Sequence, residues 1–350
     1  MSLRLKVLLL SSVAAVLLAG CGNSTKTAAV QKAEVRLTLI PLGEIGYVDS
    51  KGKMVVPPRF KSAGNFAANG LAWVVVDGKW GYMDTRGEIV IPPRFLYAGN
   101  FAANGLAWAL TSDKDGRTES GYIDAKGKMT VISPRFFNPG TFAANGLAAV
   151  RSEREERWGY INAKGKIVIQ PRFRNAGSFA ANGLAPVEVS GKWGYINAKG
   201  KEVIPPRFNA AQYFADNGLA AVRVDGKCGY INAKGEMVIP PRFERVGAFA
   251  ANGLARVWVD ERWGYIDARG EEVIPPRFQE AEDFDANGLA RVREGGGKPF
   301  SYIDANGEIA MYISWLNCMH VLRNANGDIL WPEKSVDQIC EEKRAPARNQ

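Results

Sequence analysis

The sequence predicts an all-β protein, a tandem array of eight repeats that each span roughly 35 residues and three strands. Three observations support this prediction. Gly-Tyr pairs recur between residues 46 and 265, and Ser301-Tyr302 is an altered eighth copy. A Phe-Ala-Ala-Asn-Gly segment, as at 66–70, recurs between the pairs, and each copy also contains a hairpin signature. The spacings cover residues 36–310 and therefore predict one array without a separate second domain.

The hairpin signature is an Asx residue, two variable residues and a glycine between two β-prone segments. In one copy the side chain of Asn197 caps the turn and Gly200 adopts a positive φ, which predicts a type I turn with a G1 bulge. The expected register places Tyr195 opposite Val203. The residues before this hairpin supply the third strand of the unit.

The segment after the hairpin carries two prolines and two aromatic residues. Pro205 and Pro206 predict the end of strand pairing, because proline cannot donate to the ladder. Phe208, Ala211 and Phe214 then recur at three-residue spacing. This spacing predicts a single helical turn that points both rings inward.

Three strands and one turn are too few to fold alone, so stacking against neighbours must bury the aromatic side chains. We expect an open, twisted β-solenoid. A closed β-propeller is the alternative, although roughly 35 residues and three strands are few for a four-stranded blade. Residues 36–40 begin the first unit at the same repeat position as in later units. We therefore expect no exchange of a strand between the first and last units that would close a ring. Residues 311–350, with a degenerate hairpin at 324–327, are expected to form a C-terminal cap and polar tail.

Residues 1–20 have the features of an export signal, with a positively charged start and an apolar stretch at 7–18 that is too short for a membrane span. The stretch ends in Leu-Ala-Gly-Cys21, which resembles the lipobox of bacterial lipoproteins. The resemblance implies cleavage before Cys21, a diacylglycerol on its sulfur and an acylated amine. An ordinary secretory signal with a chance cysteine is the alternative. Residues 21–35 would then be a lipidated N-terminus and a flexible tether.

The segment at 192–208 reads Lys-Trp-Gly-Tyr-Ile-Asn-Ala-Lys-Gly-Lys-Glu-Val-Ile-Pro-Pro-Arg-Phe, and Lys-Trp-Gly-Tyr returns at 79–82. This pattern, followed by Ala, Phe and Gly-Leu-Ala, resembles the WG repeat family. Other residues replace the tryptophan in some copies: Ile45, Ser120, Cys228 and Phe300. Such exchange favours a packing role at this position over catalysis. The resemblance implies β-rich repeats in bacterial, often surface or envelope, proteins and no shared enzymatic activity.

Few side chains are available for catalysis or metal binding. His320 is the only histidine, and it lies in the cap. Cys318, His320 and Cys340 lack a CxxC spacing, so they are a weak zinc signal. A disulfide between Cys318 and Cys340 is favoured, because the export signal places the chain in an oxidising compartment. Cys228 is expected to be a buried free thiol, and no cofactor or metal is expected.

The carboxylates of the hairpin turns are interpreted as structural. Asp at this position in some copies becomes Asn in others, as at Asn162, Asn197 and Asn232. Asparagine keeps the cap but has no carboxyl group for acid–base catalysis. No phosphate-binding loop or dinucleotide glycine pattern is present in the sequence. We therefore expect no enzymatic activity.

Arginine recurs at one repeat position, within Pro-Arg-Phe. The positions are Arg59, Arg94, Arg135, Arg172, Arg207, Arg242 and Arg277. In a regular stack these side chains form a stripe, and the net charge of the chain is +9. One interpretation is a stripe that binds an anion or a partner, such as a phosphate, an acidic glycan or an acidic protein face. The other is that each arginine packs on its neighbouring Phe or pairs with a carboxylate within the repeat.

Three insertions lengthen the repeat, and all three lie in the loop before the Gly-Tyr strand. They are Thr111–Ser120, Ser152–Arg157 and Glu294–Lys298. Insertions on one side of a repeat array are typical of a binding side, and neutral tolerance of surface loops is the alternative.

These observations favour a lipid-anchored cell-envelope protein that acts as a non-catalytic binding or scaffolding surface for a protein or an anionic glycan. The alternatives are a glycan- or peptidoglycan-acting enzyme or accessory, and a structural envelope spacer. Gly22 follows the lipidated cysteine, where Asp would signal retention at the inner membrane, so the outer membrane is favoured, on its periplasmic or surface face. Nucleic acid is not an expected partner of an exported protein.

Overall fold

The computed structural model describes residues 37–340, except 50, 113, 132–135, 138–139, 153–154, 317, 333–334 and 337. The expected signal at 1–20, Cys21, the tether and Arg135 lie outside the described residues. The described part belongs to one compact unit, Glu34–Gln350. Within it, no helix is long and apolar enough to cross a membrane.

The chain folds into consecutive antiparallel sheets, each built from strands that follow one another in sequence. The first sheet has three strands: β1 (Thr38–Pro41), β2 (Ile45–Val48) and β3 (Met54–Phe60). The second has β4 (Ser62–Ala63), β5 (Ala72–Val76), β6 (Lys79–Met83) and β7 (Ile89–Phe95). The third has β8 (Tyr97–Ala98), β9 (Ala107–Ser112), β10 (Thr118–Ile123) and β11 (Met129–Val131).

Three further sheets repeat this four-stranded plan. The fourth has β12 (Phe136–Phe137), β13 (Leu147–Ser152), β14 (Trp158–Asn162) and β15 (Ile167–Phe173). The fifth has β16 (Asn175–Ala176), β17 (Ala185–Val189), β18 (Lys192–Ile196) and β19 (Glu202–Phe208). The sixth has β20 (Ala210–Ala211), β21 (Ala220–Val224), β22 (Lys227–Ile231) and β23 (Met237–Phe243).

The last two sheets complete the array. The seventh has β24 (Arg245–Val246), β25 (Ala255–Val259), β26 (Arg262–Ile266) and β27 (Glu272–Phe278). The eighth begins with β28 (Glu280–Ala281), β29 (Ala290–Arg293) and β30 (Ser301–Ile303). It continues with β31 (Ile309–Leu316), β32 (Met319–Asn324) and β33 (Ile329–Trp331).

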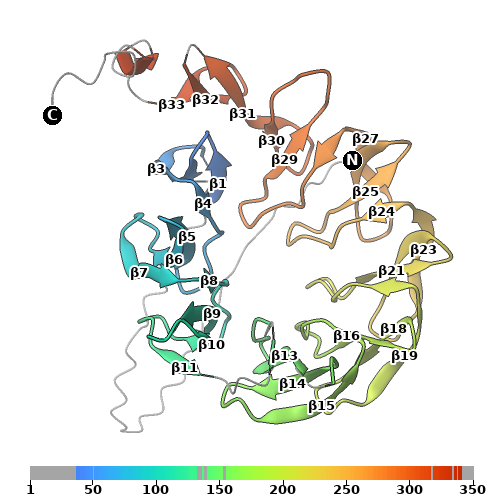
Figure 1. Cartoon of the computed structure of the whole chain (residues 1–350). Coiled ribbons are helices and arrows are strands. Elements are labelled where there is room, and N and C mark those ends of the chain that lie inside the picture. The colour runs from blue at the N-terminus through green and yellow to red at the C-terminus, as the bar shows by residue number, and fades with distance from the viewer. Residues whose placement is uncertain are drawn as a thin grey trace, which may run out of the picture. The chain divides into compact units, whose positions relative to one another are not determined.

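The eight sheets are the blades of a closed β-propeller, and the expected open solenoid is wrong. Figure 1 shows the sheets following one another around a ring, with the last strands (red) beside the first blade (blue). Ile40 and Val48 of the first blade share a buried apolar cluster with Leu289 and Leu322 of the eighth. Thr38 donates a hydrogen bond to Asp285 of the eighth blade at 2.7 Å. Among the described residues, each of these two blades is built from strands of its own segment, β1–β3 and β28–β33.

The fourth strand of each complete blade comes from the segment for which a helical turn was expected. In the fifth unit Ala210 and Ala211 form β20, which pairs with β21 opposite Arg223 and Val222. The segment is extended because it lies along the next blade, where its backbone finds ladder partners that a lone unit does not have. About 35 residues are therefore enough for a four-stranded blade, which removes the argument against the propeller.

The hairpin turn is confirmed, and the register beyond it is not. Asn197 N–H donates to the Lys201 carbonyl at 2.9 Å, and Gly200 has φ +77°. A bulge then sets Tyr195 opposite Ile204, in place of Val203. Ile204 is buried in consequence, whereas Val203 is 44% exposed. The extra residue of this bulge is Val203. Ile196 still pairs with Glu202, and beyond that pair the second strand is shifted by one position, which exchanges the faces of its side chains.

The two prolines lie inside β19, so they do not end the strand as expected. The pairing jumps from Tyr195 opposite Ile204 to Trp193 opposite Phe208, and the intervening prolines bulge out of the ladder. Gly194 faces this bulge: an added Cβ would lie 2.5 Å from the Ile204 carbonyl oxygen. The glycine of the Trp-Gly pair is therefore required by close approach of two backbones.

The buried tyrosines of the Gly-Tyr pairs join each blade to the next. Tyr195 donates a hydrogen bond through its hydroxyl to the carbonyl of Gln212 at 2.8 Å, and its ring lies 4.8 Å from the ring of Phe214. Corresponding bonds to the next blade are made by Tyr47, Tyr82, Tyr122, Tyr160, Tyr230 and Tyr265. The propeller core thus lies between the blades.

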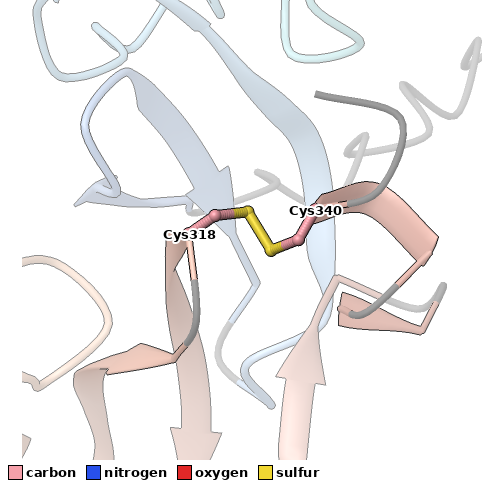
Figure 2. Close-up of a disulfide and its surroundings, with 2 residues drawn as sticks. All are labelled: Cys318 and Cys340. Carbon is pink, nitrogen blue, oxygen red and sulfur yellow. A yellow bond between two sulfur atoms is a disulfide. The ribbon is translucent and has the colours of Figure 1, made fainter. Parts of the chain in front are cut away.

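The C-terminal segment extends the eighth blade. The expected hairpin at 324–327 joins β32 to β33, and both strands belong to the sheet that begins with β28. Cys318 and Cys340 form a disulfide with their Cα atoms 5.7 Å apart (Figure 2). The disulfide links the turn between β31 and β32 to the residues that follow β33.

Candidate binding surface

The recurrent arginines connect neighbouring blades. Arg207 donates a hydrogen bond to the carbonyl of Gly235, in the hairpin turn of the next blade. Its guanidinium also lies 5.0 Å from the ring of its own neighbour, Phe208. The same pair of contacts is made by Arg59, Arg94, Arg172, Arg242 and Arg277. The repetition of arginine at this position therefore has a structural cause.

These side chains nevertheless keep a solvent-facing side. All six described members of the stripe are exposed residues, and none of the six forms an ion pair with a carboxylate of the described chain. Two contacts were expected for these arginines, packing on the neighbouring Phe or pairing with a carboxylate of the repeat, and the packing on Phe is confirmed. The contact with the next blade was not expected, because the sequence does not show which carbonyl lies across the blade interface.

A row of four aromatic side chains lies beside the first inserted loop. Trp73 contacts Trp80, Trp80 contacts Tyr97, and Tyr97 contacts Trp108, with ring centroids 4.4, 4.5 and 5.0 Å apart. Tyr97 is 44% exposed and pairs with Leu110, which directly precedes the inserted loop. The indole N–H of Trp108 is buried without an acceptor among the described residues.

The repeat framework does not require this aromatic row. At the position of Trp73 and Trp108, other blades carry Ala149, Pro186 or Ala221 and form the same sheets. The row went unnoticed in the sequence because its members come from three different repeat positions. A comparison of the copies, position by position, would have found it.

The second inserted loop borders a cavity of about 510 Å³. Its lining includes Arg157 of the loop and Trp158 of β14, together with Arg174, which follows β15, and Asn175 of β16. Arg174 pairs with Glu188 at 3.6 Å. The cavity is polar and opens to solvent.

The third inserted loop borders a cavity of about 430 Å³ between the seventh and eighth blades. The polar side chains that line it are Arg277, Glu294, Lys298, Ser301, Glu308 and Tyr312. Its apolar lining contains Phe278, Val292 and Ile303, which are buried, and Pro299 and Ile309, which are exposed. The size and the mixture of an apolar wall with a few polar groups are typical of a small-ligand site.

The charges in this cavity are coupled. Lys298 Nζ lies 2.5 Å from a carboxylate oxygen of Glu294. The hydrogen bond from Lys298 lowers the pKa of Glu294, against a smaller opposing effect of burial, and Arg277 lowers it further. Arg262 also donates to the Glu294 backbone carbonyl at 3.1 Å, which positions the loop.

The remaining chemical candidates are dispersed. His320 packs edge-on against Trp315, with ring centroids 4.8 Å apart, and the described residues contain no cluster of His, Cys, Asp or Glu that could hold a metal ion. Cys228 is a half-buried free thiol, and burial raises its pKa. The Asx side chains of the hairpin turns accept backbone N–H groups, as Asn197 does from Lys199 at 3.0 Å.

Solved structures with similar folds are distant in sequence. The chain is similar to a protein described as "eukaryotic initiation factor", with 12% identity and a TM-score of 0.55 over 85% of this chain and 95% of that chain. Kluyveromyces lactis Hsv2 has 9% identity and a TM-score of 0.43 over 73% of this chain and 94% of that chain. The dihydro-heme d1 dehydrogenase NirN has 13% identity and a TM-score of 0.45 over 78% and 74%. The first likeness shows the fold alone, and the other two carry no argument about this chain.

No curated protein matches the chain. The family model described as "WG containing repeat" matches it seven times, at residues 45–80, 80–114, 121–153, 158–193, 193–228, 229–261 and 263–297. These segments cover well over half of the chain and coincide with the repeating blades. The chain therefore belongs to the WG repeat family.

Proposed function

We propose that this WG repeat propeller is a lipid-anchored cell-envelope protein that serves as a non-catalytic binding or scaffolding surface for a protein or an anionic glycan. One observation carries the proposal. Each of the three inserted loops adjoins a feature suited to ligand contact: the aromatic row or one of the two cavities. Neutral drift in loop length gives no reason for this coincidence.

The non-catalytic part of the proposal rests on how the recurrent side chains are used. The tyrosines, arginines and turn Asx residues each satisfy a backbone partner within the propeller. The framework uses these side chains, so recognition is left to the variable side chains near the inserted loops and to the solvent-facing edges of the arginines. Such a surface binds a partner without changing it covalently.

The anchor is proposed from the lipobox-like sequence that ends at Cys21. Two or more acyl chains hold a protein stably at a membrane, whereas one alone gives marginal binding. Cys21→Ala should therefore move the protein from the membrane fraction to the soluble fraction of the envelope. Unchanged fractionation would contradict the anchor without touching the binding proposal.

The binding surface is tested by shortening the inserted loops. Residues 112–118, 153–156 and 295–298 are each replaced by Asp-Gly, the pair with which the second blade makes the same turn at Asp77 and Gly78. The mature chain and the shortened chain are immobilised, and retention of acidic envelope polysaccharide and of envelope proteins is measured. Thermal unfolding verifies that the shortened chain is folded.

Loss of retention in the folded, shortened chain is the expected result. Equal retention by both chains would place binding elsewhere on the propeller and overturn the proposal. Turnover of isolated peptidoglycan by the mature chain would contradict the non-catalytic part and favour an enzyme. Absence of any retained ligand would favour a structural spacer.

A further inference from the structure

The cavity between the seventh and eighth blades exists because the eighth unit departs from the repeat. Ser301 stands where the seventh unit has Gly264, and β31 lacks the two prolines that bulge from β27. β31 instead continues in regular register, with Tyr312 opposite Ser301. The loop at 294–298 closes one side of the space. The combination occurs once in the chain, so it serves no repeated structural need.

The cationic groups of the cavity have spare hydrogen-bonding capacity. Arg277 uses one nitrogen, Nη2, on the Gly307 carbonyl at 2.6 Å, and no acceptor among the described residues takes its other N–H groups. Lys298 is held by Glu294, but its side chain is 65% exposed. A carboxylate that entered the cavity would meet the free edge of Arg277 and compete with Glu294 for Lys298.

The acidic groups define what else the ligand must carry. Glu294 and Glu308 both line the cavity. A phosphate dianion would be repelled by these two carboxylates, because like charges at close range are unfavourable in a partly desolvated site. A ligand with one negative charge and several hydroxyl groups fits better, since its hydroxyls donate to the carboxylates and its own carboxylate accepts from the cations.

The apolar lining of the cavity indicates what the uncharged part of the ligand is. Pro299, Ile309 and Tyr312 give the cavity an apolar lining that solvent reaches, and Ile309 is 43% exposed. Ser301 and Tyr312 add hydroxyl groups to the same lining. A pyranose ring presents axial C–H groups on its faces and hydroxyls on its edge. It therefore matches a site whose lining combines solvent-facing apolar side chains with hydroxyl groups.

We propose that this cavity binds one hexuronate residue of an acidic polysaccharide, with its carboxylate on Arg277 and Lys298 and its ring against Ile309. The proposal deepens the function proposed above and rests on it, because it selects an anionic glycan over a protein as ligand. Glu294 then acts as a gate that occupies Lys298 until the sugar carboxylate replaces it.

Binding of a short oligogalacturonate to the mature protein, measured by titration calorimetry, tests the proposal. Lys298→Met should weaken binding about tenfold or more, as expected for one charge-assisted hydrogen bond. Glu294→Gln should strengthen binding several-fold, because it frees Lys298 and removes a like charge. Lys234→Met, in an exposed turn of the sixth blade, makes the same change of charge away from the cavity and should have no effect.

The probes include a neutral galacto-oligosaccharide of equal length and inorganic phosphate, both of which should bind at least tenfold more weakly. Equal binding of phosphate would show a plain anion site, and equal binding by the Lys298→Met protein would place the sugar elsewhere; either result overturns the proposal. Loss of envelope ligands on loop shortening, with oligogalacturonate binding intact in Lys298→Met, would leave the proposed function standing and this inference refuted. Unchanged retention of envelope ligands on loop shortening, together with weakened oligogalacturonate binding in Lys298→Met, would refute the proposed function alone.

Discussion

The hydroxyl of Tyr302 donates a hydrogen bond to the carbonyl oxygen of Leu39 at 3.3 Å, across a sequence separation of 263 residues. Seven other tyrosines make the equivalent bond to the following blade, as Tyr195 does to Gln212. The Tyr302 hydrogen bond therefore joins the last blade to the first in the same way as the other seven join neighbouring blades. The interface also places Gly52 against Leu330 and Met311, whereas an arginine lies against the turn glycine at six other interfaces of the described residues.

Tyr302→Phe tests the closure of the ring. The substitution removes one buried hydrogen bond and leaves the ring in place, so we expect the free energy of unfolding to fall by about 1 kcal/mol in a urea titration. Tyr195→Phe is the matched control inside the array and should lower it by a similar amount. A measurable loss for Tyr195→Phe together with none for Tyr302→Phe would indicate that the first and last blades are not in contact.

The contact between Arg207 and Gly235 is tested by a pair of glycine substitutions. Gly235 and Gly226 have φ +83° and +84°, so alanine meets the same backbone strain of about 1–2 kcal/mol at each position. An added Cβ at Gly235 would lie 3.0 Å from Ile204 and 3.2 Å from Arg207, whereas at Gly226 nothing lies within 4 Å. Gly235→Ala should therefore lower the free energy of unfolding more than Gly226→Ala does, by chemical denaturation. Equal losses would mean that the blade interface is loose at this turn.

The repeat unit, its turn and its family were predictable from the sequence because they depend on local chemistry. Asn197 and Gly200 specify their turn through their own side chain and backbone freedom. The fourth strand was not predictable, because Ala210 and Ala211 are extended only through pairing with β21. Closure of the ring was missed for a related reason: it depends on the small rotation between blades, which no single repeat specifies.

The candidate site was predictable only in outline. The inserted loops mark two cavities and the aromatic row, as a comparison of repeat lengths suggested. The surroundings of Arg277 and Lys298 were not predictable, since Tyr312 lies opposite Ser301 only because β31 continues in register where other blades have the proline bulge. A departure from the repeat therefore indicates where a candidate site lies, whereas tertiary packing determines which chemical groups line it.

The disulfide between Cys318 and Cys340 is expected to stabilise the eighth blade. It joins residues 22 apart in sequence, and the loss of chain entropy in the unfolded state corresponds to about 3 kcal/mol. Replacing both cysteines with serine should lower the free energy of unfolding by roughly that amount. It should also speed proteolytic cleavage after β33. Cys228→Ser, at a free and half-buried thiol, is the control and should change neither. Cleavage at an unchanged rate in the double variant would show that β31–β33 hold the segment without the disulfide.

The eight interface tyrosines predict steep loss of stability in alkali. Burial raises the pKa of each phenol well above its ordinary value near 10: Tyr47, Tyr82, Tyr122, Tyr160, Tyr195, Tyr230, Tyr265 and Tyr302. The folded state therefore keeps protons that the unfolded state releases above about pH 10. A raised folded pKa gives stability that is complete below the unfolded pKa and is lost as the pH rises beyond it. Each tyrosine contributes a slope of about 1.4 kcal/mol per pH unit in that range.

Urea titrations between pH 8 and pH 11 measure this slope, and absorbance near 295 nm follows tyrosinate. We expect the free energy of unfolding to fall steeply above about pH 10, with most tyrosinate absorbance appearing together with the loss of β-sheet circular dichroism. Tyr195→Phe should reduce the slope by about 1.4 kcal/mol per pH unit, because one fewer proton is released. Ionisation of the eight phenols before any loss of sheet structure would show that water reaches the blade interfaces, and the tyrosines would then not be what holds neighbouring blades together.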